Sequence, residues 1–123
     1  MQHPLRRFKA ELFKALSHPG RIKMLEALRS GEKTVGELQA LLDDEPGSAS
    51  QHLALLRARN IVVARKEGNN IFYSVRDPLL FRILDAAREI FSNQLVDSQQ
   101  MLSYVQEEEE AVGAGPGGAA EGA

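Results

Sequence analysis

The spacing of the apolar residues changes near residue 60, and this change limits the folds open to the chain. Up to Arg59, apolar residues recur every three or four positions, as on one face of a helix. From Ile61, "IVVARK" and "IFYSV" are rich in β-branched and aromatic residues and are separated by "EGNN", which predicts a β-hairpin. The helical spacing returns after Pro78. These changes predict a mainly α fold with a small β-hairpin.

Three helices are predicted before the first sharp break in the chain. Apolar residues at helical spacing indicate helices over 4–16 and 19–29. Thr34 and Glu37 have the spacing of a capping box, in which each side chain binds a backbone N–H of the other residue. We therefore expect a short third helix that begins at this pair and ends near Leu42.

A fourth helix follows the break "DDEPG". Pro46 suits the first turn of this helix, which we expect to end near Arg59. Asn60 then tolerates the left-handed conformation that often terminates helices. The resulting order, α-α-α-α-β-β-α, is that of a winged helix-turn-helix with added terminal helices.

The fourth helix contains an unusual polar face. Ala49, Leu53 and Leu56 form its buried stripe, yet short polar residues rather than Lys and Glu flank that stripe. In a winged helix-turn-helix this helix enters the major groove, where Gln can bind adenine through two hydrogen bonds and Ser or His can donate to bases or phosphates. The predicted DNA-binding residues are Ser48, Ser50, Gln51, His52 and Arg57 on the helix, and Arg65, Lys66, Asn69 and Asn70 on the hairpin.

The charge distribution supports this interpretation better than the net charge of −2 does. Of the 17 acidic residues, five lie at 107–110 and 121, which leaves 12 against 15 Lys and Arg in residues 1–106. Residues 45–76 hold five basic and two acidic side chains. The positive surplus therefore surrounds the fourth helix and the hairpin.

The last helix has more apolar surface than one small domain readily covers. Its apolar positions alternate at spacings of four and three, as in a coiled coil, so a partner helix is implied. Gln94 and Ser98 are polar positions inside this seam; they either set the register of a dimer or line a pocket for an unknown effector. The seam comprises Leu80, Leu84, Ala87, Phe91, Gln94, Ser98, Met101 and Val105.

Two regions of different composition are predicted. Residues 1–106 form the DNA-binding and dimerisation domain. Residues 107–123 begin with four glutamates and continue as a Gly/Ala/Pro tract with few groups to bury, so we expect a disordered tail.

Several function classes are disfavoured. The chain has no cysteine, which excludes disulfides and thiolate chemistry. No apolar run or leader suits a membrane helix or signal peptide, so we expect a cytoplasmic protein without membrane contact. Ser48, Ser50 and His52 share one helix and cannot form a catalytic triad, and we expect no enzyme activity.

The three histidines are scattered in sequence and do not predict a metal site. We expect His18 to cap or pack a helix and His3 to belong to a frayed terminus. His52 lies at the border of the buried stripe, so it either faces DNA or forms a hydrogen bond at the edge of the core.

Three segments, in order, resemble the ArsR/SmtB family of bacterial winged-helix repressors: "ALSHPGRIKMLEAL", "SASQHLALLRARNIV" and "ARKEGNNIFYSV". The resemblance covers about residues 8 to 105. It implies a homodimer, paired through the first and last helices, that binds an inverted repeat in double-stranded DNA and represses transcription until a signal releases it. The interface residues would be Leu5, Phe8, Leu12, Leu84, Ala87, Phe91, Gln94, Ser98 and Met101.

The chain departs from the family's metal sensors. Those sensors carry a Cys-x-Cys pair in the third helix, where this chain has "VGELQAL". Of the second family site, only Asp85 remains, with Ala87, Ser98 and Met101 at the other positions. We therefore expect no metal and no cofactor. The alternative from another class is a winged-helix adaptor whose fourth helix binds a protein partner.

Overall fold

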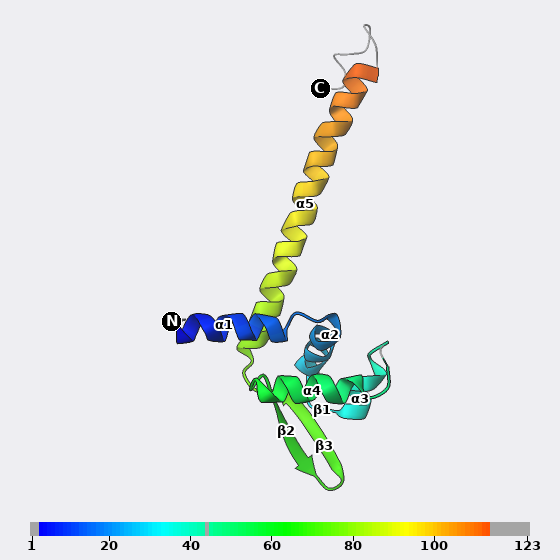
Figure 1. Cartoon of the computed structure of the whole chain (residues 1–123). Coiled ribbons are helices and arrows are strands. Elements are labelled where there is room, and N and C mark those ends of the chain that lie inside the picture. The colour runs from blue at the N-terminus through cyan, green and yellow to red at the C-terminus, as the bar shows by residue number, and fades with distance from the viewer. Residues whose placement is uncertain (1–2, 44, 114–123) are drawn as a thin grey trace. The chain divides into compact units, whose positions relative to one another are not determined.

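The computed structural model describes residues 3–43 and 45–113, and the chain divides into two compact units after Leu84 (Figure 1). We call the part up to Leu84 the winged unit, and residues 85–113 the distal helix. The elements follow the predicted order, with a short 3₁₀ helix and one short strand added.

Histidine side chains begin the first two helices, α1 (Pro4–Ala15) and α2 (Pro19–Ala27). His18 Nδ1 accepts a hydrogen bond of 2.9 Å from the Gly20 N–H, which confirms the predicted cap. His3 Nδ1 accepts one of 3.2 Å from the Leu5 N–H. The expectation of a frayed end at His3 was therefore wrong, because this ring supplies an acceptor to the first turn of α1. A short 3₁₀ helix, η1 (Leu28–Ser30), follows α2.

The capping box predicted at Thr34 and Glu37 is present and begins α3 (Val35–Ala40). The helix after the turn, α4 (Ser48–Ala58), begins two residues later than Pro46, where the sequence predicted it. Gly47, which precedes α4, has a φ of +89°, a conformation that a side chain would strain.

The end of α4 confirms the role predicted for Asn60. Its φ is +60°, and the Asn60 N–H donates to the Arg57 carbonyl over 3.0 Å. The Ile61 N–H donates to the Leu56 carbonyl over 2.9 Å. This pair of bonds is a Schellman motif, which satisfies the last carbonyls of the helix and turns the chain into the hairpin.

The sheet has three antiparallel strands in the order β1-β3-β2. The predicted hairpin is present as β2 (Val62–Glu67) and β3 (Asn70–Val75). We name this hairpin the wing; it extends beyond α4 in Figure 1. The sequence did not predict β1 (Lys33–Thr34), which pairs with β3. Two residues are too few to show a strand period.

The core of the winged unit gathers apolar side chains from its helices and from the start of the wing. Met24, Leu25 and Leu38 are fully buried, as are Ala49 and Leu56 from α4. Tyr73 and Val75 of β3 pack against this cluster. The core thus fixes α4 against α2, α3 and one face of the sheet.

The last helix, α5 (Leu79–Gly113), is longer than expected. The sequence predicted that the disordered tail would begin at Glu107, but Glu107–Glu110 continue the helix, in keeping with the good helix propensity of Glu. The rest of the predicted tail, residues 114–123, lies outside the described residues. None of the helices in the described ranges combines the length and apolar content needed to cross a bilayer.

Candidate nucleic-acid interface

The two sides of α4 differ sharply in burial and composition. Ala49, Leu53 and Leu56 are at most 1% exposed. On the other side Ser50, Gln51 and Arg57 are exposed. Neither Gln51 nor Arg57 forms an ion pair or side-chain hydrogen bond with any other residue in the described ranges. These three predicted DNA-binding residues are therefore accessible on α4.

Gln39 of α3 holds the start of α4, a role that the sequence did not suggest. Its Oε1 accepts a hydrogen bond of 2.9 Å from the Ala49 N–H, and its Nε2 lies 3.3 Å from Ser48 Oγ. Its Nε2 also donates to the Glu45 carbonyl over 3.4 Å. Gly47 offers no side chain to cap α4, so Gln39 takes over that task from the neighbouring helix. Ser48 is half-buried in this contact and is less accessible than Ser50.

His52 lies at the edge of the core. Its ring centroid is 4.4 Å from that of His18, and its Nδ1 lies 3.5 Å from Arg21 Nη1. Arg21 also donates to the Ala15 carbonyl over 2.6 Å. The half-buried ring thus faces α2, which favours the core-edge alternative over the DNA-facing one.

Arg65 and Lys66 lie on opposite faces of the wing, although the sequence grouped both as DNA-binding residues. Residues directly opposite in an antiparallel pair share a face, and neighbours along a strand alternate. Lys66 pairs with Ile71, on the face that also carries Val62, Ala64 and Tyr73. This face packs against α4 through the buried Val62 and through Tyr73. Lys66 is therefore on the same side of the sheet as α4.

Arg65 lies on the opposite face, where two carboxylates bind it. It donates two hydrogen bonds to Glu32, of 3.0 and 2.9 Å, and one of 2.9 Å to Glu67. Its guanidinium also lies over the Phe72 ring, 5.0 Å from the centroid. The hydrogen bonds from Arg65 hold the pKa of Glu32 below its ordinary value of 4.5. The pKa of Arg65 is raised, mainly by its hydrogen bonds to Glu32 and, to a lesser extent, by the one to Glu67. Arg65 thus joins the wing to the loop before β1.

The tip of the wing is a two-residue turn. Glu67 pairs with Asn70, which leaves Gly68 and Asn69 between the strands. Gly68 has a φ of +61° in the first turn position, where tight hairpins commonly place glycine. Asn69 and Asn70 are both exposed, so the tip presents amide groups without charge.

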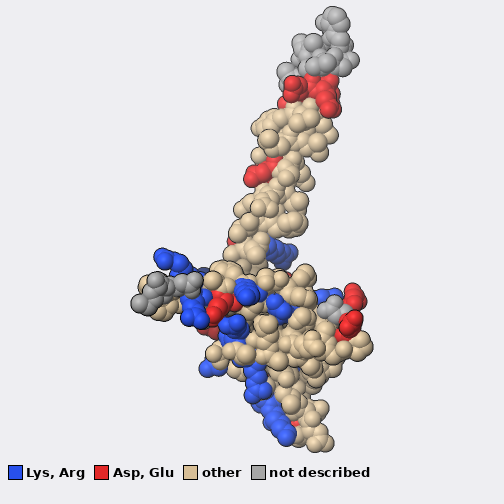
Figure 2. All heavy atoms as spheres, in the orientation of Figure 1, with Lys and Arg blue, Asp and Glu red and all other residues tan. Residues whose placement is uncertain are grey.

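Basic side chains follow one side of the winged unit. Figure 2 shows Lys and Arg over α1, near α4 and along the wing, whereas acidic side chains gather near the loop between α3 and α4. Arg59 at the end of α4 pairs with Glu11 of α1 over 3.1 Å. In the part of the chain that the structure describes, Lys66 forms no ion pair.

Most of the residues predicted to form a dimer interface are exposed. Leu5 and Phe8 of α1 are 54% and 58% exposed, and Phe91 and Met101 of the distal helix are 61% and 66% exposed. Ala87, Gln94 and Ser98 are also exposed. Leu12 and Leu84 instead pack against the core of the winged unit. The described residues contain no group of three or more His, Asp or Glu side chains placed to hold a metal ion.

A family model described as "Bacterial regulatory protein, arsR family" matches residues 18–63, the segment from the cap of α2 to the start of the wing. Rv0081, an HTH-type transcriptional regulator of Mycobacterium tuberculosis, is 40% identical over 102 residues, which are 80% of this chain and 88% of that protein. A biofilm growth-associated repressor of Agrobacterium fabrum is 40% identical over 82 residues, 67% of this chain and 70% of the repressor.

Solved structures agree with the fold. The crystal structure of Rv0081 matches with a TM-score of 0.69 and 38% identity, over 79% of this chain and 98% of that one. The homodimeric winged helix-turn-helix DNA-binding domain of Mb0332 from Mycobacterium bovis matches with a TM-score of 0.67, over 76% and 91% of the two chains. Its identity of 24% supports likeness of fold alone. The predicted winged helix-turn-helix is thereby confirmed.

Proposed function

Because this chain belongs to the ArsR family of bacterial regulatory proteins, we propose that it is a homodimeric repressor that binds an inverted repeat in DNA. Its relatives are transcriptional regulators rather than enzymes. Transcriptional regulation is the function of this family. The proposal adds the oligomeric state, the form of the operator and the residues that bind it.

The exposed side of α4 is the observation that carries the proposal. Ser50, Gln51 and Arg57 are accessible on a helix whose opposite side is buried. Short side chains permit close approach to base edges, Gln51 offers both a donor and an acceptor, and Arg57 attracts phosphate. We assign base recognition to Ser50 and Gln51, and backbone contacts to Arg57, Lys66, Asn69 and Asn70. Ser48, His52 and Arg65 have structural partners that account for them.

A second copy of the chain would place two such helices on one duplex. Two-fold symmetric winged-helix dimers place their reading helices about 34–36 Å apart, one turn of DNA, so each half-site of a palindrome meets the same residues. The exposed apolar residues of α1 and of the distal helix supply a surface for this pairing. In this proposal residues 1–106 carry both DNA binding and dimerisation.

We also propose that the signal that releases the repressor does not act through a thiolate metal site. The chain has no cysteine, and a small effector bound near Gln94 and Ser98 of paired distal helices fits the sequence better. Addition of zinc should then leave both melting temperature and operator affinity unchanged.

The test compares variants on a selected operator. The wild-type protein first selects its binding sites from fragmented genomic DNA, and affinities are then measured on the selected duplex and on a scrambled duplex. Gln51→Ala should weaken operator binding by about 1–3 kcal/mol and relax the preference at one base pair. Lys66→Ala should weaken binding to both duplexes and lower the slope of log affinity against log salt by about one.

Arg65→Ala is the matched control, because it removes a neighbouring positive charge from the other face of the wing. It should leave the salt slope nearly unchanged. Equal losses for Gln51→Ala and Lys66→Ala on both duplexes would contradict the assignment. Failure of the wild-type protein to select any DNA would favour the protein–protein adaptor instead.

A further inference from the structure

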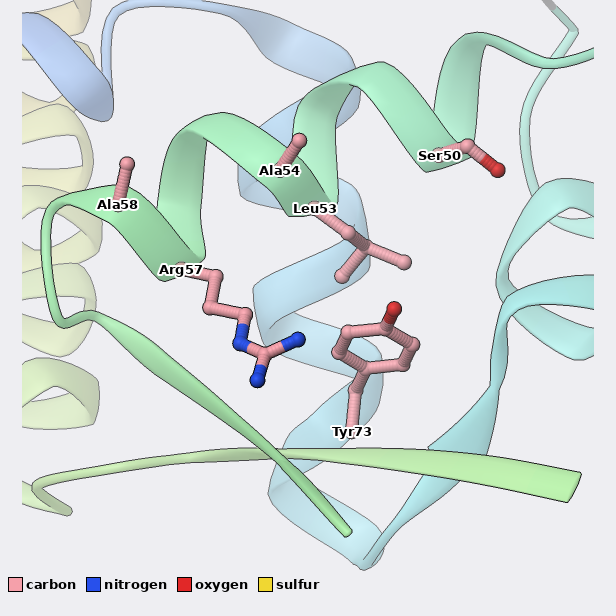
Figure 3. Close-up of a pocket in the computed structure, with 6 residues that line it drawn as sticks. All are labelled: Ser50, Leu53, Ala54, Arg57, Ala58 and Tyr73. Atoms are coloured by element: carbon pink, nitrogen blue, oxygen red, sulfur yellow. The ribbon is translucent and has the colours of Figure 1, made fainter. Parts of the chain in front are cut away.

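A groove between α4 and β3 combines charge, hydroxyl groups and small side chains (Figure 3). Its volume is about 410 Å³, and it is open to solvent rather than enclosed. It runs beside the exposed side of α4, next to the residues proposed to recognise bases. The lining residues are Ser50, Leu53, Ala54, Arg57, Ala58 and Tyr73.

The polar groups of the groove are hydrogen-bond donors. In Figure 3 the guanidinium of Arg57 and the hydroxyl of Tyr73 both point into the space between α4 and β3. Ser50 adds a second hydroxyl nearer the start of α4. Among the described residues no carboxylate pairs with Arg57, so its charge is available to an anion. Tyr73 was absent from the DNA-binding residues predicted from sequence.

Small side chains line the groove on the side of α4. Ala54 and Ala58 are exposed alanines one turn apart, and Leu53 is buried beneath them. The part of α4 that borders the groove at these two positions therefore carries no long side chain. An extended, narrow group such as a sugar-phosphate chain can therefore approach the floor between Arg57 and Tyr73.

The sheet side of the groove continues the positive charge. Tyr73 is opposite Lys33 of β1 and Ala64 of β2, so Lys33 lies on the same face of the sheet. Lys66 lies on this face two residues beyond Ala64, toward the tip of the wing. Lys33 and Lys66 thus lie on the same face of the sheet as Tyr73, and Arg57 lines the groove with it, whereas Arg65, bound by Glu32 and Glu67, lies on the other face.

We propose that this groove binds one backbone phosphate of the DNA, with Arg57 and the Tyr73 hydroxyl both donating to it. The proposal rests on the proposed function and adds a positioning contact between the helix and the wing. Donors from two elements would fix the depth and rotation of α4 in the major groove, because phosphate contacts set orientation while base contacts set sequence. A small organic ligand would remain largely exposed in so open a groove, whereas DNA brings its own covering surface.

Removal of one hydroxyl tests the contact without removing charge. Tyr73→Phe keeps the ring that packs against the core, so the melting temperature should stay close to wild type. It should weaken binding to selected and scrambled duplexes alike by roughly tenfold, the effect expected for a hydrogen bond to a charged group, with an unchanged salt slope. Arg57→Gln should weaken both and lower the slope by about one. Tyr104→Phe on the distal helix is the matched control and should bind as wild type.

Neutral methylphosphonate linkages, placed one at a time in the duplex, locate the phosphate. One such linkage in each half-site should weaken binding by the wild-type protein. The same linkage should not weaken binding by Arg57→Gln further, and it should weaken binding by Tyr73→Phe less than binding by wild type. If the wild-type protein binds its operator but Tyr73→Phe binds equally well, or no linkage shows this coupling, the groove contact is overturned and the proposed function stands. If the wild-type protein binds no DNA, both are overturned.

Discussion

The winged unit and the distal helix have similar apolar spacing, but among the described residues only the winged unit buries a core of apolar side chains. Leu25, Leu38 and Leu56 of the winged unit are fully buried. In the distal helix Ile90, Phe91 and Leu95 are 48–61% exposed. Helical spacing therefore predicts which residues share a face, while burial depends on whether another element is present to pack against that face.

The largest expected effect tests this contrast with one substitution in each unit. Leu53→Ala removes a side chain that is 1% exposed, so it should lower the free energy of unfolding by about 2–5 kcal/mol. Leu95→Ala removes one that is 48% exposed, and in dilute solution it should change the free energy by less than about 0.5 kcal/mol. Urea unfolding followed by circular dichroism measures both. A loss for Leu95→Ala as large as that for Leu53→Ala at every protein concentration would remove the contrast.

A smaller effect concerns what covers the distal helix. If a second copy does, Phe91→Ala should raise the dimer dissociation constant by roughly tenfold or more, because each copy loses a buried aromatic ring. Sedimentation equilibrium measures this constant. Gln100→Ala is the control. Gln100 lies on the opposite, polar side of the helix from Phe91, so this substitution should leave the dissociation constant unchanged. A wild-type chain that sediments as a monomer throughout the accessible range would argue against the dimer.

The smallest effect lies within the winged unit, where α3 depends on its cap. The backbone N–H and then the hydroxyl of Thr34 hydrogen-bond to Glu37 and hold its pKa below the ordinary value of 4.5. A carboxyl whose folded pKa is lowered stabilises the fold above its unfolded pKa, and this contribution is lost as the pH falls through the folded value. Glu37→Gln does not titrate, so the stability advantage of wild type over this variant should shrink between neutral pH and about pH 3.

Urea midpoints at the two pH values measure that difference. Thr34→Ala removes the hydroxyl from the same capping box and should cost about 1 kcal/mol at neutral pH. It should also reduce the loss of stability that protonation of Glu37 causes, because the hydroxyl helps to lower the pKa of Glu37. An advantage of wild type over Glu37→Gln that grows on acidification would contradict the direction of the pKa shift.

Local chemistry made much of the fold predictable. Thr34 with Glu37, His18 before Pro19, and Asn60 after α4 each act on backbone groups within a few residues, so sequence spacing alone identifies them. The change of period at Ile61 identified the wing for the same reason. The two-residue strand β1 was missed because its pairing with β3 involves residues far apart in sequence.

The site was less predictable because it depends on contacts between elements. Arg65 and Lys66 are neighbours in sequence, and strand alternation alone could have placed them on opposite faces. The same alternation places Glu67 on the face of Arg65, but it could not identify Glu32, which comes from a distant loop. Tyr73 looked like an ordinary strand residue, and only its position in the groove beside α4 suggests the role proposed for its hydroxyl.

Gln39 has a consequence for how such a protein could change its affinity. Its single amide spans the joint between α3 and α4, accepting from Ala49 and donating toward Glu45. A Gln39→Glu substitution would replace this amide with a carboxylate, which keeps the hydrogen-bond acceptor but loses the donor. Substitution there should tilt the reading helix and weaken operator binding while every DNA-contacting side chain stays the same. Affinity can thus be tuned by a residue that is not among the proposed DNA contacts.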